Sequence, residues 1–110
     1  MNSKVWIVVG ILLLFARLVE TVDAANKTWS GSAINNSWSQ TGNWSPSGAP
    51  QENDSLFFSG NTKTTNNNNL AANTIFSGIT FNSGAEAFVL GGSEIDLAGD
   101  IVNNSTNTQT

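Results

Sequence analysis

The chain has 110 residues, with four lysines or arginines against eight aspartates or glutamates, and its formal net charge at neutral pH is −4. Beyond residue 24 its cations are Lys27 and Lys63. So few cations cannot follow a phosphate backbone, where each contact needs a lysine or arginine, so nucleic acid is not an expected partner. The sequence has no cysteine and no histidine, which excludes disulfides and histidine-based zinc sites as sources of stability.

Residues 1–24 have the pattern of a secretory signal peptide. Lys4 precedes an apolar run from Val5 to Ala16, and an A-x-A-like cleavage site ends at Ala24. The alternative is an uncleaved anchor, but the run is shorter than the roughly 18 to 20 apolar residues that a membrane span needs. We therefore expect export and cleavage after Ala24. The membrane would be a partner only through a signal segment that stays uncleaved.

Residues 25–53 form a turn-rich segment that contains Trp29, Trp38 and Trp44 and lacks helical periodicity. We expect an N-terminal cap in which the three rings are buried, because large aromatic side chains are highly buried on average. In the alternative, the indoles are exposed on a polar β face and stack on sugar rings. The chain would then be a carbohydrate-binding module with polysaccharide as its partner.

Residues 54–110 carry short apolar pairs that alternate with polar residues, as in strands with one buried face. The pairs are Leu56/Phe58, Ile79/Phe81, Phe88/Leu90 and Ile95/Leu97. Glycine removes the Cβ that hinders sharp bends, so we expect bends at Gly84, Gly91/Gly92 and Gly99. The stretch from Asn66 to Asn69 is expected to be a polar loop. Asn, Ser, Thr and Gly are abundant throughout and disfavour helices, so the expected fold class is all-β.

Equivalent apolar positions return at a nearly constant interval, with a shift of 23 residues from Leu56 to Ile79 and of 22 from Ile79 to Ile101. Such a return is typical of a solenoid, because each coil brings its strand back over the previous one to bury a continuous interior. We therefore predict the start of a parallel β-helix, with these three residues one above another on adjacent parallel strands. The alternative is a small antiparallel β-sandwich, which strands spaced by roughly 8 to 12 residues also fit.

Two stretches, NWSPSGAPQENDSLFFSG (43–60) and NTIFSGITFNSGAEAFVLGGSEIDLAGDIVNNST (73–106), resemble the autotransporter-associated β-strand repeat proteins. The likeness covers residues 28–110 and depends mainly on the run F-x-G-I-T-F-N-x-G-A from Phe76 to Ala85. It implies a right-handed parallel β-helix in a bacterial, exported, passenger-like or adhesin-like scaffold at the cell surface, associated with the outer membrane. It brings no catalytic residues. Its partners would be cell-surface components.

Members of that group are commonly far longer, and the autotransporter type carries a membrane domain that has no counterpart here, so self-export is not expected. The sequence stops at NNSTNTQT, directly after the strand expected around Ile101. A stack that is open at its end exposes unpaired strand edges. We therefore expect this chain to be the front of a longer repeat protein, a truncated gene product, or a small relative that has only the cap and the first coils.

Glu52 and Asp54 are close in sequence, but a glycosidase needs two carboxyl groups roughly 5 to 10 Å apart across a cleft. Asp54 is expected to cap the turn that enters the following strand. The sequence has no histidine base, cysteine nucleophile or G-x-S-x-G motif. We therefore expect no enzyme activity, no catalytic residue and no cofactor.

The stretch from Gly91 to Asp96 resembles one copy of the calcium-binding nonapeptide G-G-x-G-x-D, with Glu94 in place of a glycine. Calcium sites of this kind are built by stacking several copies, so we expect a solvated turn and no metal. Asparagines that stack from coil to coil would form amide ladders, with Asn82, Asn103 and Asn104 as candidates. Ordinary turn formation is the expected role of these three residues.

Overall fold

The computed structural model describes residues 23–110, in which short strands dominate and a single 3-10 helix is present. The elements are β1 (Asn26–Trp29), η1 (Thr41–Asn43), β2 (Trp44–Ser45), β3 (Ser55–Phe58), β4 (Thr65–Asn68), β5 (Thr74–Phe76), β6 (Gly78–Phe81), β7 (Val89–Gly92), β8 (Ile95–Leu97) and β9 (Ile101–Asn103). The predicted all-β class is confirmed. Residues 1–22 of the expected signal peptide lie outside the described residues. In the described part no helix is long and apolar enough to cross a membrane.

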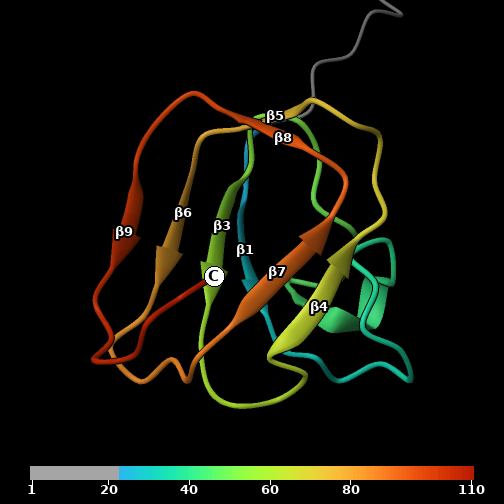
Figure 1. Cartoon of the computed structure of the whole chain (residues 1–110). Coiled ribbons are helices and arrows are strands. Elements are labelled where there is room, and N and C mark those ends of the chain that lie inside the picture. The colour runs from blue at the N-terminus through green and yellow to red at the C-terminus, as the bar shows by residue number, and fades with distance from the viewer. Residues whose placement is uncertain (1–22) are drawn as a thin grey trace, which may run out of the picture.

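The strands form three sheets, of which the largest has the order β2-β1-β3-β6-β9. Figure 1 shows β1, β3, β6 and β9 side by side. The second sheet pairs β4 with β7, and the third pairs β5 with β8. Every pair of these strands is parallel except β1 and β2, which makes the five-stranded sheet mixed. This pairing differs from the antiparallel sandwich that the strand spacing also allowed.

The register of the five-stranded sheet follows the interval seen in the sequence. Leu56 on β3 is the Cα partner of Ile79 on β6, and Ile79 is the partner of Ile101 on β9. The prediction that these residues lie on adjacent parallel strands in register is therefore confirmed. The other two sheets keep similar shifts, since Asn66 is paired with Leu90 and Thr74 with Ile95.

The core is built mainly from aromatic rings, and Phe58 is its central member. Its ring centroid lies 5.4 Å from those of Phe81 and Phe88, and 5.9 Å from those of Trp38 and Trp44. Aromatic pairs in offset or edge-to-face geometry contribute roughly 0.5 to 1.5 kcal/mol beyond their area burial. Rings from the expected cap and from the later strands thus belong to one cluster.

The expected polar loop at Asn66 to Asn69 is wrong, because most of this stretch forms strand β4. The burial of β4 alternates, and the side chains of Asn66 and Asn68 are the buried ones. Asn66 Oδ1 accepts a hydrogen bond of 2.8 Å from Trp38 Nε1, and Asn68 Nδ2 donates one of 2.9 Å to the Ser93 carbonyl oxygen. Buried amides are stable when they are hydrogen-bonded, so asparagine here takes positions usually held by apolar residues.

The glycines at which bends were expected lie in turns or at the end of a strand. Gly84 lies in the turn between β6 and β7, Gly91 and Gly92 end β7, and Gly99 lies between β8 and β9. At Gly99 the backbone passes so close to Ser77, which lies between β5 and β6, that a Cβ would collide with the Ser77 carbonyl oxygen. A larger residue at position 99 would push the β8–β9 connection away from the β5–β6 connection.

Candidate functional site

The three tryptophans, which were the candidates for sugar stacking, lie in the interior. Trp29 and Trp38 are 1% exposed and Trp44 is 3% exposed. Trp44 packs edge-to-face against both other rings, with centroid distances of 5.2 Å to Trp29 and 5.7 Å to Trp38. No indole face of the three is open to a flat sugar ring. The carbohydrate alternative therefore loses the side chains on which it depended, because stacking needs an accessible ring.

The indole N–H groups of the three tryptophans are used inside the protein. Trp29 Nε1 donates to the Thr62 carbonyl oxygen at 3.1 Å, and Trp44 Nε1 donates to that of Trp38 at 2.9 Å. Trp38 Nε1 donates to Asn66 Oδ1. The bonds of Trp29 and Trp38 join segments that are distant in the sequence, and the bond of Trp44 lies within the segment between β1 and β3. These residues therefore organise the N-terminal part of the fold.

The buried side-chain amide of Asn43 organises the segment between β1 and β3, which carries Trp38 and Trp44. Its Nδ2 donates to the carbonyl oxygens of Asn35 and Ser37 at 2.9 and 3.0 Å, and its Oδ1 accepts from the Ala33 backbone N–H at 2.9 Å. The chain then enters β2, which pairs antiparallel with β1. One edge of the β1 strand is thereby covered, and the first end of the strand ladders is closed by β2 and the tryptophans.

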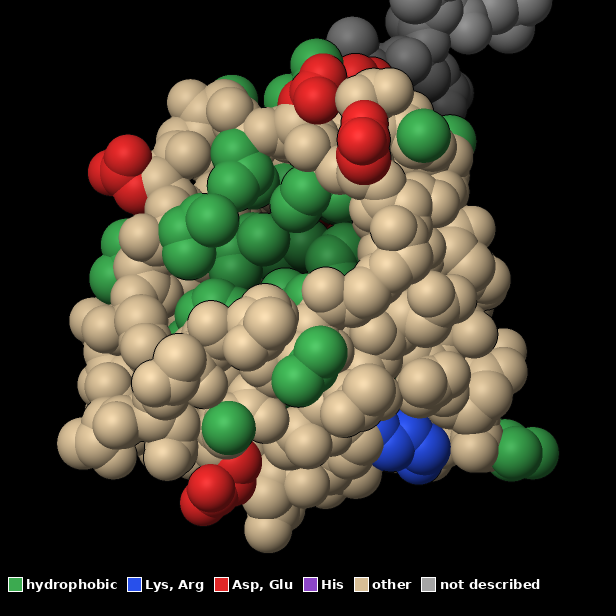
Figure 2. Space-filling view, viewed as in Figure 1, with side chains coloured by type: hydrophobic (Ala, Val, Ile, Leu, Met, Phe, Trp, Pro, Cys, Tyr) green, Lys and Arg blue, Asp and Glu red, His purple; other side chains and the backbone are tan. Residues whose placement is uncertain are grey.

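At the other end of the ladders, apolar side chains stay uncovered. Ile101 is 62% exposed, and Val102 beside it on β9 is also exposed. A hollow of about 200 Å³ opens here, which we name the end face and define by its lining residues Ile79, Phe81, Leu90, Ile101, Gln109 and Thr110. Figure 2 shows hydrophobic side chains gathered in a hollow that β7, β8 and β9 frame in Figure 1. Contiguous apolar surface of this kind marks places where other protein surfaces pack.

The residues after β9 return toward β7 and border the end face. The Thr110 backbone N–H donates to the Phe88 carbonyl oxygen at 3.0 Å, and the Leu90 N–H donates to the Thr110 carbonyl oxygen at 2.8 Å. This is the hydrogen-bond pattern of a residue in a parallel ladder. Thr110 is thus placed opposite Val89, as Val89 itself is placed opposite Thr65. Thr110 therefore lies on the edge of β7 that β4 leaves free.

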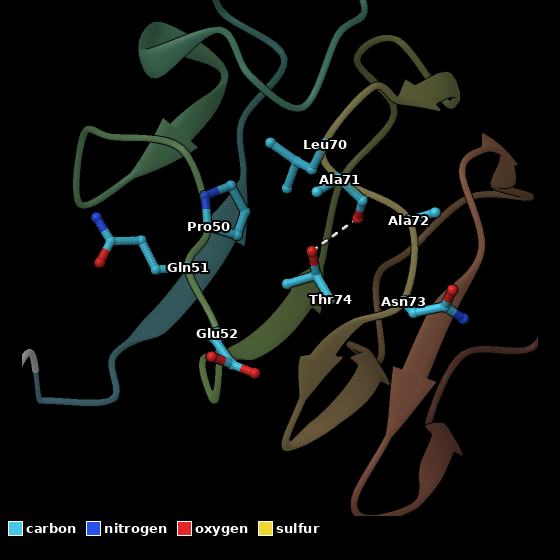
Figure 3. Close-up of a pocket in the computed structure, with 8 residues that line it drawn as sticks. All are labelled: Pro50, Gln51, Glu52, Leu70, Ala71, Ala72, Asn73 and Thr74. Atoms are coloured by element: carbon cyan, nitrogen blue, oxygen red, sulfur yellow. Dashed lines mark hydrogen bonds between the residues drawn. The ribbon is translucent and has the colours of Figure 1, made fainter.

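Another hollow, of about 470 Å³, lies on a different surface, between residues 50–52 and 70–74 (Figure 3). Pro50 and Leu70 face each other across it, while the Gln51 side chain points away. Thr74 Oγ1 donates to the Ala71 carbonyl oxygen at 2.7 Å. Glu52 is the one ionisable residue of its lining.

The two neighbouring carboxyl groups serve different purposes. Asp54 is buried, and its Oδ2 accepts the Gln51 backbone N–H at 2.8 Å, which closes the turn before β3. The predicted capping role of Asp54 is confirmed by this bond. Glu52 is exposed to solvent.

The loop that resembles a calcium nonapeptide forms the corner between β7 and β8. Asp96 Oδ1 accepts a hydrogen bond of 3.3 Å from Asn73 Nδ2, and the Ser93 carbonyl oxygen is held by Asn68. Within residues 23–110, no group of three or more acidic side chains is close enough together to hold a metal ion.

Side-chain amides act at positions other than those proposed for ladders. Asn82 and Asn104 use their backbone N–H groups, which donate to the carbonyl oxygens of Phe58 and Phe81. Asn103 Nδ2 bonds within its own turn, to the Asn107 carbonyl oxygen. The amides with structural roles in the interior are Asn43, Asn66 and Asn68. The spacing of two residues between Asn66 and Asn68 was the available signal, since it matches the strand period.

In comparisons with known proteins, no family model, no curated protein and no solved structure matches the chain.

Proposed function

We propose that this chain is part of an exported, non-enzymatic scaffold at a bacterial cell surface, built as a right-handed parallel β-helix of the autotransporter-associated repeat type. The observation that carries the proposal is the register of Leu56, Ile79 and Ile101 on adjacent parallel strands. Stacked strands in register bury a continuous interior, and a structure that grows by adding layers serves as a stalk or display surface.

The end face supports the proposal because it has the composition of an interior surface. Ile79 and Phe81 are buried, whereas Ile101, which continues the ladder of Leu56 and Ile79, is largely exposed. A further layer with the same alternation would cover Ile101 as β9 covers Ile79. The placement of Thr110 on β7 supplies the first hydrogen bonds of such a layer.

An added layer tests this proposal. A second copy of Leu90–Ser105, attached directly after Thr110, places its apolar residues at a return of 21 residues, the shift that already pairs Thr110 with Val89 and Thr74 with Ile95. Covering Ile101 alone is worth roughly 1.5 to 3 kcal/mol. We expect the free energy of unfolding in urea to rise by about that amount, and the β9 amides to become protected from hydrogen exchange.

The matched control carries the same extension with serine at the copied positions of Leu90, Ile95, Leu97 and Ile101. It has equal length but lacks the inward-facing apolar side chains of the copied layer, so its stability should stay at the level of the parent chain. Equal stability of the two extended proteins would contradict the β-helix proposal.

Export is tested separately by expressing the full chain in a bacterium and fractionating the cells. We expect the protein outside the cytoplasm, and we expect Leu13→Arg, which interrupts the apolar run, to retain it inside. Recovery of both proteins from the cytoplasm would contradict the export part of the proposal.

A further inference from the structure

Ala25 is fixed by hydrogen bonds from both of its backbone polar groups. Its N–H donates to Asp54 Oδ1 at 2.8 Å, and its carbonyl oxygen accepts from the Ser55 N–H at 2.9 Å. Asp54 is only 3% exposed, and its second oxygen is occupied by the Gln51 N–H. The start of β1 is therefore anchored to the start of β3 through the Asp54 carboxylate.

The same atom, the Ala25 nitrogen, belongs to the peptide bond that the A-x-A-like pattern marks for cleavage. Ala24 and Asp23 are exposed and lie before the first strand. Hydrolysis by a signal peptidase breaks the bond between the Ala24 carbonyl carbon and the Ala25 nitrogen. Water supplies the oxygen of the new Ala24 carboxylate, and its two protons convert the amide N–H into an ammonium group.

We propose that removal of residues 1–24 creates an α-ammonium group on Ala25 that forms an ion pair with the buried Asp54 carboxylate, so that signal cleavage itself strengthens the attachment of β1 to β3. The inference requires the export and cleavage of the proposed function. An amide offers one donor and no charge at this position, whereas an ammonium offers three donors and a full positive charge. Charge-assisted hydrogen bonds are roughly twice as strong as neutral ones.

The surrounding charges favour the cleaved form. Asp54 shares a hollow of about 330 Å³ with the side chains of Asp23 and Lys27, the titratable groups of its lining. Lys27 Nζ is committed to the Pro46 and Ser47 carbonyl oxygens, at 2.9 and 3.4 Å. Cleavage removes Asp23 and its negative charge from this hollow. Glu52, two residues from Asp54 in sequence, is exposed to solvent.

The sign of the pH dependence follows from the new group. An α-amino group has a reference pKa of about 8, and a carboxylate partner raises the pKa in the folded state. Its contribution to stability is therefore fully present below about pH 8 and is lost as the pH rises through the higher folded-state pKa. The terminal amine should therefore lose charge within the window between about pH 7 and 9.5.

The experiment uses protein that is exported from the full chain, with its N-terminus identified by intact mass. We expect Ala25 at the N-terminus and a Tm that falls by roughly 4 to 8 °C between pH 7 and 9.5. In a variant with one serine inserted between Ala24 and Ala25, the Ala25 nitrogen stays an amide, so this fall should disappear while Asp54 is unchanged. Asp54→Asn should remove the fall as well, and Glu52→Gln should keep it.

Each outcome decides a different question. An Ala25 N-terminus with equal pH profiles for the parent and the serine-insertion variant would overturn the ion pair and leave the proposed export intact. Cleavage at another bond would also overturn the ion pair alone. A protein that retains Met1 would overturn both the export and this inference.

Discussion

Phe58 and Phe81 are Cα partners on adjacent parallel strands, and their rings stack with centroids 5.4 Å apart and planes inclined by 28°. The same kind of side chain thus recurs in successive layers at the same place in the sheet. This stacking places the interior of each layer directly on that of its neighbour. Stability should therefore depend most on residues that contact two layers.

Phe58→Ala should destabilise the protein strongly, because its ring contacts the tryptophans of the first layers and the phenylalanines that follow. We expect a loss of about 3 to 5 kcal/mol in the free energy of unfolding, measured in urea. Phe57 alternates to the opposite side of β3 and is only half-buried. Phe57→Ala is the control and should cost about 1 kcal/mol. Equal losses for the two variants would contradict the assignment of Phe58 as the centre of the core.

Gly99→Ala should also destabilise the protein, because the added methyl group would collide with the Ser77 carbonyl oxygen of the adjacent layer. The expected loss is about 1 to 3 kcal/mol by thermal or urea unfolding. Gly84→Ala is the matched control, since a Cβ at Gly84 meets no atom within 4 Å. The prediction fails if both substitutions leave stability unchanged.

Asn66→Ala should remove the acceptor of the Trp38 indole N–H and leave a buried donor without a partner. The expected cost is about 1 to 3 kcal/mol, with a shift of the Trp38 indole resonance in the NMR spectrum. The neighbouring Asn67 is exposed, so Asn67→Ala should change stability by less than about 0.5 kcal/mol. An unshifted Trp38 resonance in Asn66→Ala would argue against this hydrogen bond.

Ile101→Lys tests the end face. In the chain as it stands, this side chain is largely exposed, so the substitution should change stability by less than about 0.5 kcal/mol and reduce the binding of a hydrophobic dye. In the protein extended by the copied layer, the same lysine would be buried, and it should cancel the gain in stability. A large loss in the unextended chain would show that Ile101 already packs against other residues.

Much of the strand pattern was predictable because burial in a strand leaves a local mark. Leu56/Phe58 and Ile79/Phe81 alternate with polar residues, since successive side chains point to opposite faces. The return of 22 or 23 residues between Leu56, Ile79 and Ile101 predicted their register.

The sequence predicted the burial of the three tryptophans, but only the tertiary structure decided which polar side chains are buried and which partners they bind. Asn66 and Asn68 occupy interior positions because Trp38 and Ser93 supply their hydrogen-bond partners, at sequence separations of 28 and 25 residues. Ala25 meets Asp54 across 29 residues in the same way. An apolar side chain needs no particular partner in order to be buried, so its burial can be predicted from the alternation of apolar and polar residues along the chain. A polar side chain is buried only where a hydrogen-bond partner is present, and the tertiary structure determines which residue that partner is.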